Sequence, residues 1–347
     1  MKVAIGTKIQ EGPWGGGNLF AINLSNFLIK NGHEVVYDLK DNDIDIILLT
    51  EPRKTSLTSS FNHKDIQEYI DYKNKSALVF HRINECDERK GTDYLNQFII
   101  NSNKCSDISI FVSNWLKNLY VKQGVDHSSS KVILAGADKE IFNSNNSSSW
   151  NGIDKLKIIT HHWGTNLNKG FNIYKFIDNM LNDDFWNKRI EFSFLGNTPK
   201  NFSFENTRVI KPTSGIDLAN TLKEHHLYIT GSLFEPSGNH HIEAAQCGLP
   251  VFYIPSGGTT EYCKDFGIPY SLDNLEKKLN IFMNDYEYFY NKMKSYPFNA
   301  EKMCQDYINL FTESLDEKNK IITKRIETNK NIIKWIIHKF KLVVFNK

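Results

Sequence analysis

The sequence has 347 residues, of which 40% are hydrophobic and 24% charged, so the chain is long enough for two packed cores. An aromatic content of 13% argues against disorder, and a net charge of +2 is too balanced for general nucleic-acid binding, so we expect no nucleic-acid partner. The five cysteines include no CxxC pair, which disfavours a disulfide framework or a zinc site and indicates a reducing cytosol.

The first residues, MKVAIGTKIQEG, contain only a short apolar run. This run is too short for a signal-peptide core and predicts a first β-strand. No stretch of the sequence approaches the roughly 18 consecutive apolar residues of a membrane span. We therefore expect a cytoplasmic protein.

Short apolar runs alternate with helical patterns along the first 150 residues. After the first strand, apolar residues recur at helical spacing from Phe20 to Leu28, and Asn31-Gly32 provides a helix stop. Strands this apolar predict a parallel sheet covered by helices on both faces. The expected strands are residues 3–6, 34–38, 44–49, 77–81, 108–112 and 131–134.

Residues 143–152, NSNNSSSWNG, are polar and aperiodic, which predicts an interdomain linker or surface loop. The alternation then resumes, and we expect an α/β chain with two Rossmann-like, doubly wound domains at residues 1–150 and 151–300, followed by a C-terminal segment at 301–347. The second set of expected strands is 156–160, 191–195, 208–210, 227–230 and 251–254. The expected helices are 171–181, 216–224, 239–247, 272–284 and 299–318.

The most informative segment is residues 234–261, FEPSGNHHIEAAQCGLPVFYIPSGGTTE. It follows a predicted strand, and its glutamates Glu235 and Glu243 are separated by seven residues. In an open α/β sheet, ligands bind beyond the carboxyl ends of the strands. Glu235 would lie in the loop after the strand and reach a transferred sugar. Glu243, expected in the first turn of the next helix, would bind two ribose hydroxyls.

The turn between these glutamates suits a phosphate. Ser237, Gly238 and Asn239 let backbone N–H groups approach phosphate oxygens, and the helix that starts near Asn239, with His240 in its first turn, adds its positive dipole end. The second glycine turn, with Gly258 and Thr259, is expected to close over the same ligand. The segment therefore predicts a nucleotide-diphosphate site.

The whole segment, with Glu-x7-Glu, a run similar to AxxCGLPV, and then GG before Glu261, resembles the signature of retaining glycosyltransferase family 4 (glycosyltransferases group 1). Four other segments are similar to motifs of that family and follow in the expected order. They are GPWGGG at 12–17, SDISIFVSNWLKNL at 106–119, VILAGADKEIF at 132–142, and Lys169-Gly170. The resemblance implies the GT-B fold, with two domains facing each other across a cleft.

The resemblance also implies a reaction and its participants. The donor would be a nucleoside-diphosphate-sugar, the acceptor a glycan, and the anomeric configuration would be retained. Lys169 would neutralise the diphosphate with the help of backbone amides, so no metal and no other cofactor is expected. The loop of Gly15, Gly16 and Gly17 would support the donor phosphate or the acceptor. It lacks the GK[ST] ending of a P-loop and does not fit GxGxxG.

His81 has two interpretations. It ends a buried strand in a region where the family often has a functional histidine, which makes it a candidate catalytic residue. A buried structural histidine is the rival interpretation. His161, His162, His240 and His241 are expected in loops around the phosphate site without an accompanying Cys or Asp cluster, so they do not predict a metal centre.

Two positions depart from the family pattern. The family usually has an Arg five residues before Lys169, where this chain has Gly164, and an Asn where this chain has Ala135. Lys169 would act alone, or His161 or His162 would replace the missing cation.

The segment Lys318–Lys347 contains nine Lys and Arg residues against one acidic residue, Glu327. Two interpretations stay open: a closing helix that packs on the first domain with a basic end, or an amphipathic anchor on an anionic membrane at the inner face of the plasma membrane.

The predicted function is transfer of a hexose-type sugar to a glycan, which is expected to be a lipid-linked intermediate of a bacterial lipopolysaccharide or capsule. The pathway rests on analogy. Two alternatives are an epimerase of nucleotide-sugars on the same architecture and a non-catalytic nucleotide-sugar-binding or membrane-docked partner protein.

Overall fold

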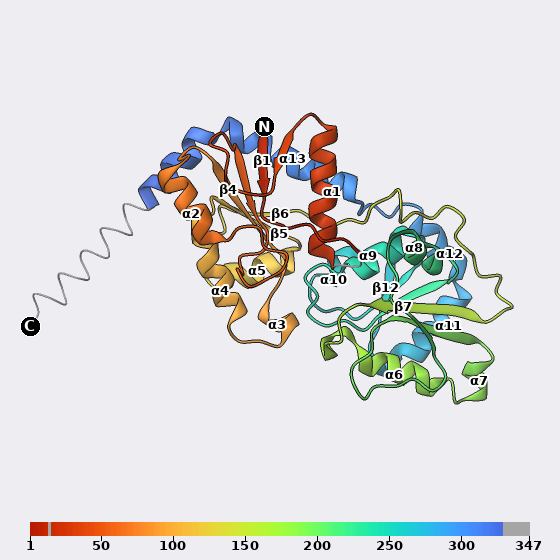
Figure 1. Cartoon of the computed structure of the whole chain (residues 1–347). Coiled ribbons are helices and arrows are strands. Elements are labelled where there is room, and N and C mark those ends of the chain that lie inside the picture. Colours follow the sequence, from red (N-terminus) through yellow and green to blue (C-terminus); the bar gives the residue numbers. More distant parts are fainter. Residues whose placement is uncertain (13–14, 329–347) are drawn as a thin grey trace, which may run out of the picture.

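The computed structural model describes residues 1–12 and 15–328. Within them the chain forms two six-stranded sheets, one in each half of the sequence, with helices on both faces (Figure 1). The strands of each sheet pair in parallel. The predicted α/β architecture with two doubly wound sheets is confirmed. Residues 13–14 of the glycine loop and 329–347 of the basic segment lie outside the described residues.

The first sheet has the order β2-β1-β3-β4-β5-β6, so the strand order reverses between β1 and β3. Residues 46–49 are buried throughout, as expected for a strand covered on both faces. The strands are β1 (Lys2–Ile5), β2 (Glu34–Val36), β3 (Ile46–Leu49), β4 (Leu78–Ile83), β5 (Ile108–Phe111) and β6 (Ser130–Val132). The helices are α1 (Gly16–Lys30), α2 (His63–Tyr72), α3 (Asp87–Lys90), α4 (Leu95–Ser102), the 3-10 turn η1 (Asn103–Cys105) and α5 (Asn114–Lys122).

The second sheet has the order β12-β11-β10-β7-β8-β9, and its order reverses between β7 and β10. Its strands are β7 (Leu156–His162), β8 (Ile190–Gly196), β9 (Arg208–Ile210), β10 (Leu227–Thr230), β11 (Val251–Tyr253) and β12 (Gly267–Pro269). Its helices are η2 (Leu167–Lys169), α6 (Phe171–Met180), α7 (Asp184–Asn187), α8 (Gly215–Lys223), α9 (Asn239–Gln246), α10 (Thr259–Cys263), η3 (Leu272–Asn274), α11 (Leu275–Asn284) and α12 (Tyr286–Met293).

The predicted strands are all present, with ends that shift by at most two residues. The sequence did not predict β12, the edge strand beside β11. This strand has only one buried apolar residue, Ile268, between a glycine and a proline, so no apolar run marks it.

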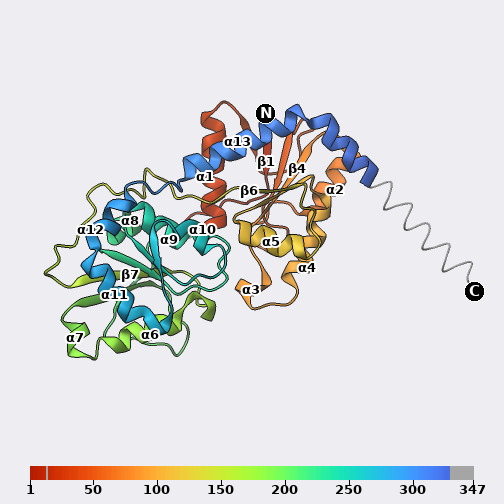
Figure 2. The same ribbon diagram turned by 180° about the vertical axis from the view of Figure 1, so that it is seen from behind.

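Helix α13 (Ala300–Asp316) returns from the second half to the first and packs beside α1, as seen from behind in Figure 2. Its Tyr307 ring lies 5.1 Å from the Phe20 ring, and its Phe311 ring lies 4.8 Å from the Phe80 ring. Helical structure resumes at residue 318 and runs to residue 328. There Arg325 donates hydrogen bonds to the carboxylate of Asp107 in the first half.

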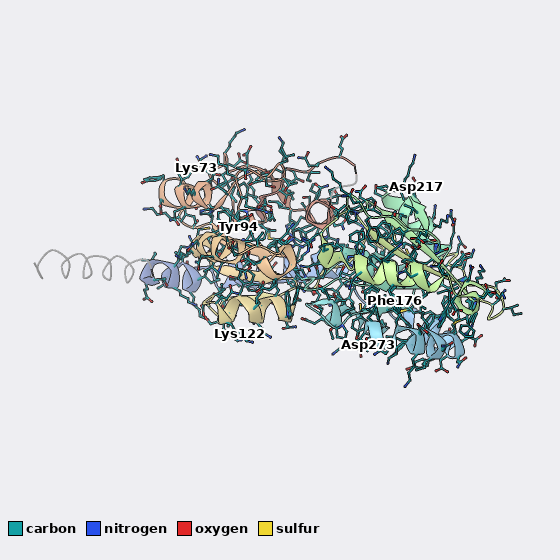
Figure 3. The ribbon with its side chains drawn as sticks, turned by 90° about the horizontal axis from the view of Figure 1, so that it is seen from below. Lys73, Tyr94, Lys122, Phe176, Asp217 and Asp273 are labelled. Atoms are coloured by element: carbon teal, nitrogen blue, oxygen red, sulfur yellow. The ribbon has the colours of Figure 1, made fainter. Side chains whose placement is uncertain are left out.

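The two halves lie side by side, with Lys73 and Lys122 on one and Phe176 and Asp273 on the other in the view from below (Figure 3). A carboxylate from the second half joins them. Glu261 accepts hydrogen bonds from the backbone N–H groups of Asn114 and Trp115, each at 2.8 Å, at the N-terminus of α5. A negative charge is favourable there because it meets the positive end of the helix dipole.

Gly196 ends β8 where a side chain has no room. Its φ is +138°, and a Cβ atom would lie 1.9 Å from the carbonyl oxygen of His162 at the end of β7. The substitution Gly196→Ala is expected to lower the free energy of unfolding by more than about 2 kcal/mol, measured by urea denaturation. Gly124→Ala is the matched control, because Gly124 has φ +103° but nothing within 4 Å of its Cβ position. Equal losses in the two variants would mean that backbone conformation, not the contact with His162, is responsible.

Candidate active site

A cavity of about 420 Å³ lies between the carboxyl ends of the two sheets. Its first wall contains Gly16, which follows β1, and Thr50, which follows β3. Its second wall contains Lys169, after β7, and Glu235, after β10. These are the strand pairs at which each sheet reverses its order, and open α/β sheets bind ligands at such points.

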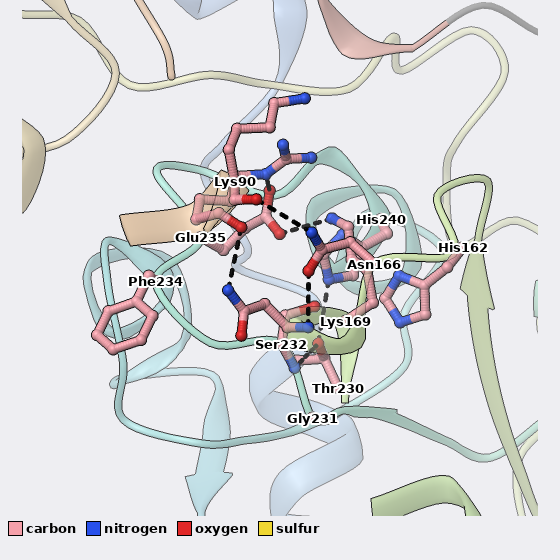
Figure 4. A network of polar contacts seen from close by, with 12 residues as sticks. Lys90, His162, Asn166, Lys169, Thr230, Gly231, Ser232, Phe234, Glu235 and His240 are labelled. Atoms are coloured by element: carbon pink, nitrogen blue, oxygen red, sulfur yellow. Dashed lines mark hydrogen bonds and ion pairs between the residues drawn. The ribbon is translucent and has the colours of Figure 1, made fainter. Parts of the chain in front are cut away.

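Glu235 is held by one cation from each half of the chain. Lys169 Nζ donates to Glu235 Oε2 at 2.6 Å, and Arg89 Nε donates to Glu235 Oε1 at 3.1 Å (Figure 4 shows the surroundings of Lys169 and Glu235). Arg89, on α3, also pairs with Glu85 at 2.9 Å. Both carboxylate oxygens of Glu235 therefore carry a charge-assisted hydrogen bond.

These contacts fix the charge states of the group. Burial would raise the pKa of Glu235, but the charges of Lys169 and Arg89 hold it well below its usual range. Burial lowers the pKa of Lys169, and the charge of Glu235 opposes that shift. Burial also works against the charge of Arg89, yet Glu235 and Glu85 raise its pKa. Glu235 is therefore a carboxylate near neutral pH and not a proton donor.

The backbone around Lys169 is set by a close approach of two chain segments. Gly170 has φ +90°, and a Cβ atom there would lie 2.4 Å from the backbone of Gly231 at the end of β10. Leu233 N donates to the carbonyl of Asn168 at 2.7 Å, and the Asn168 side chain donates to the carbonyl of Arg89 at 3.1 Å. The glycine after Lys169 is thus required by packing, and the same loop contacts α3.

Two helix N-termini meet at the cavity. Helix α9 begins after Gly238, and α1 begins after Gly15, and neither has a side-chain cap or an acidic residue in its first turn. A Cβ atom on Gly16 would lie 2.8 Å from the side chain of Asn239, so the two ends are close. Ser237, Gly238, Asn239, His240 and the glycines 15–17 all line the cavity. Uncapped N–H groups and aligned dipoles favour an anion between the two helices.

Glu243 lies in the second turn of α9, not in the first turn as predicted, because the helix begins at Asn239. Its Oε2 atom is 3.0 Å from His161 Nε2, and both residues line the cavity. His161 and His162 end β7 instead of lying in the loop that was expected there. His240 and His241 belong to α9, in agreement with the helix predicted at 239–247.

Several of these histidines are neutral. Burial holds the pKa of His162 and of His240 well below the ordinary value, and burial lowers the pKa of His241 to about 3. Lys169 and the neighbouring histidines act in the same direction for His162. His162 therefore does not supply the positive charge that Gly164 lacks.

Comparisons with known proteins identify structures that share this architecture. No protein-family model and no curated protein matches the sequence. Solved structures do match. HepE from Anabaena in complex with UDP and glucose has 14% identity and a TM-score of 0.64, covering 90% of this chain and 100% of that one. The catalytic domain of starch synthase IV from Arabidopsis thaliana, bound to ADP and acarbose, has 14% identity and a TM-score of 0.66, covering 91% and 99%.

A glycosyltransferase from Rickettsia africae matches with 14% identity and a TM-score of 0.65, over 90% of this chain and 98% of that one. This chain has the GT-B fold. The fold predicted from the motif order is thereby confirmed. In GT-B terms, the cavity with Lys169 and Glu235 is the cleft between the two sheets.

Three predicted site residues do not line the cavity between the two sheets. His81 is 1% exposed, its Nδ1 atom lies 2.9 Å from Asn103 Oδ1, and burial lowers its pKa to about 4. This environment supports the structural interpretation of His81. Gly258 N donates to the carbonyl of Glu235 at 2.8 Å, and Thr259 is fully buried. The second glycine turn thus contacts the Glu235 loop and does not line the cavity.

The structure supplies cations that sequence reasoning missed. Gly164 lines the cavity, as the family Arg position would, but the second cation on Glu235 is Arg89 from the first half of the chain. Arg53 and Arg82 also line the cavity. The motifs identified in the sequence contain no signal for these arginines, because Arg53 lies in the segment after β3, Arg82 in β4 and Arg89 in α3, outside every recognised motif.

Within residues 1–12 and 15–328, no group of three or more His, Cys, Asp and Glu side chains is placed to hold a metal ion. In the same part of the chain, no helix combines the length and the apolar character needed to span a bilayer.

The buried histidines predict a pH dependence of stability. His241 has both ring nitrogens buried without a partner, and burial lowers its pKa to about 3. Between about pH 6.5 and the folded pKa, the unfolded state binds the proton that the folded state does not, so the free energy of unfolding falls as the pH is lowered. We expect the loss between pH 8 and pH 5 to be about 2 kcal/mol smaller in His241→Leu than in the wild type, by urea denaturation.

The control for this comparison is His127→Leu, at an exposed position, which is expected to keep the wild-type pH dependence. An unchanged pH dependence in His241→Leu would contradict the assignment of His241 as a neutral, buried group.

Proposed function

We propose that this chain is a retaining glycosyltransferase that moves a hexose-type sugar from a nucleoside-diphosphate-sugar to a glycan acceptor. The observation that carries the proposal is the pair of cations, Lys169 and Arg89, gathered on Glu235 where the N-termini of α1 and α9 meet. Positive charge and free N–H groups at one point suit a diphosphate. The related folds described with UDP or ADP are consistent with this use of the cleft.

The diphosphate is the leaving group, and its negative charge grows as the bond to the sugar breaks. Lys169, Arg89 and the N–H groups of residues 238–240 would stabilise that charge, so they would contribute to catalysis as well as binding. Glu243, next to His161, would bind the ribose hydroxyls. Glu235, as a carboxylate, would hold hydroxyls of the transferred sugar while it orients the two cations.

Glu235 is a poor nucleophile because both of its oxygens accept hydrogen bonds from cations. Attack by the acceptor on the same face as the departing diphosphate, through an oxocarbenium-like species, accounts for retention without a covalent intermediate. Enclosure of the cavity between the two halves would exclude water, which otherwise competes as an acceptor.

The proposed setting is the synthesis of a lipid-linked bacterial surface glycan, such as a lipopolysaccharide or capsule, at the inner face of the plasma membrane. The basic segment that begins at Lys318 supports peripheral contact with anionic lipids through its lysines. Arg325, by contrast, pairs with Asp107 of the first half and is proposed to have a packing role.

The function is tested by nucleotide binding. The purified chain is screened by thermal shift, in EDTA, against UDP, GDP, ADP and their sugars. A donor nucleotide is expected to raise the midpoint of thermal unfolding. At a concentration one hundred times its Kd, it should add about 3 kcal/mol to the free energy of unfolding. Glu243→Ala is expected to lose most of that shift. No shift from any nucleotide would reject the proposal.

Product analysis then separates transfer from the alternatives. A transferase is expected to release the nucleoside diphosphate faster when a glycan acceptor is added. Conversion of the sugar without an acceptor would favour an epimerase instead. Binding without any turnover would favour a non-catalytic protein.

Arg89 is expected to be the second cation of the diphosphate site. Arg89→Gln should lower kcat/KM by roughly 10²-fold, because one charge-assisted contact to the developing negative charge is lost. Lys90→Gln is the matched control: Lys90 is the next residue of α3 and pairs with Glu85, 3.2 Å away, but not with Glu235. Similar losses in the two variants would mean that the position of α3, rather than the Arg89 charge, is what the reaction requires.

A further inference from the structure

Four histidines are buried in and around the second wall of the cavity: His161, His162, His240 and His241. Within the described residues, two of them contact hydroxyl groups and a third has no partner at either ring nitrogen. His161 contacts a carboxylate instead, because its Nε2 atom lies 3.0 Å from Oε2 of Glu243. The proposed function assigns Glu243 to the ribose and gives His161 no role of its own.

The surroundings of His161 determine where its ring proton lies. Nδ1 is buried and has no hydrogen-bond partner among the residues that the structure describes, whereas Nε2 faces Glu243. An N–H group at Nδ1 would be an unsatisfied buried donor, so the proton of the neutral ring belongs on Nε2, which donates to the carboxylate. This contact commits Nε2 to Glu243, so the ring does not replace the cation that is missing at Gly164.

Tyr228, on β10, fixes both the backbone and the ring of His161. Its hydroxyl accepts a hydrogen bond from His161 N at 3.2 Å and donates one to His161 O at 3.3 Å. The two rings meet edge-on with their centroids 5.5 Å apart, and Tyr228 is fully buried. Because packing already orders the His161 ring, holding Glu243 costs little additional conformational entropy.

Glu243 is only 5% exposed, and His161 is the partner of one of its two oxygens. In the part of the chain that the structure describes, the other oxygen, Oε1, accepts no hydrogen bond. Each carboxylate oxygen can accept two hydrogen bonds, so both oxygens keep lone pairs for a ligand. A carboxylate that is held in place in the cavity wall and has spare acceptors suits two neighbouring hydroxyl donors.

We propose that His161 is a positioning residue that holds Glu243 for the 2′- and 3′-hydroxyls of a ribose. The donor is then a ribonucleoside-diphosphate-sugar and not a 2′-deoxy one, such as a deoxythymidine-diphosphate-sugar. The inference rests on the proposed function, which it deepens by naming the class of donor. A 2′-deoxyribose would leave the buried carboxylate short of one donor. Without His161, Glu243 would be a nearly buried charge without a partner, which favours a side-chain position turned toward water.

The inference is tested by calorimetric titration of the full chain with UDP, GDP and ADP, with their 2′-deoxy forms, and with deoxythymidine diphosphate. The wild type is expected to bind its preferred ribonucleotide roughly tenfold to hundredfold more tightly than the deoxy form, because one hydrogen bond to a charged acceptor is lost. In His161→Phe this ratio should approach one, and binding of the ribonucleotide should weaken roughly tenfold. His161→Gln keeps an N–H donor near the position of Nε2 and is expected to retain most of the ratio.

The matched control is His225→Phe. His225 is 3% exposed and lies within hydrogen-bond distance of Ser193 and of the carbonyl of Thr221, but it does not line the cavity. Its replacement is expected to leave the ratio unchanged.

Two further variants make the outcome specific. In a Glu243→Gln background, His161→Phe should change the ratio no further, because the two residues act through one contact. His161→Asn, whose amide reaches only as far as Nδ1, replaces His161→Phe if that variant does not fold.

Three results would overturn the inference. An unchanged ratio in folded His161→Phe would make His161 a packing residue. Equal binding of the ribo and deoxy forms by the wild type, or tighter binding of deoxythymidine diphosphate than of any ribonucleotide, would reject the class of donor. All three would leave the proposed transfer reaction standing. A wild type that binds no nucleotide of either kind would reject the proposed function, and this inference with it.

Discussion

The arrangement of the cleft depends on one buried carboxylate shared between the two halves of the chain. Glu235 follows β10, yet one of its oxygens is held by Arg89 of α3 and the other by Lys169. Removing either cation would leave a buried charge partly unpaired, at a cost of several kcal/mol. The contact therefore fixes how α3 and the loop after β7 face each other, and the hydrogen bond from Asn168 to the carbonyl of Arg89 supports the same position.

Much of this fold can be predicted from short segments of the sequence. Strands of a parallel sheet are covered on both faces, so each appears as an apolar run, such as residues 46–49 or 227–230. Glu235 could be placed at the cleft because it lies in the loop after a predicted strand, whereas Lys169 was placed there by the resemblance of Lys169-Gly170 to a family motif. The apolar runs do not fix positions inside helices: Glu243 lies in the second turn of α9, because the helix begins four residues before it, at Asn239.

The remaining features depend on contacts between distant segments. His81 lies near the carboxyl end of β4 and Thr259 at the start of α10, as cleft residues can, but both side chains are buried, and His81 is within hydrogen-bond distance of Asn103. Arg89 meets Glu235 across 146 positions of sequence, which no local pattern encodes. The absence of an Arg at Gly164 looked like a lost charge in the sequence. In three dimensions the charge is present, but it comes from the other half of the chain.

Helix α13 has a consequence for the order in which the chain can fold during synthesis. Its Tyr307 and Phe311 cover Phe20 and Phe80 of the first half. Phe311 leaves the ribosome about 180 residues after the last strand of the first sheet, roughly 10 to 40 s later at ordinary rates of translation. During that interval the first sheet has an apolar face without its covering helix, so a nascent chain of this protein is a natural client for chaperones.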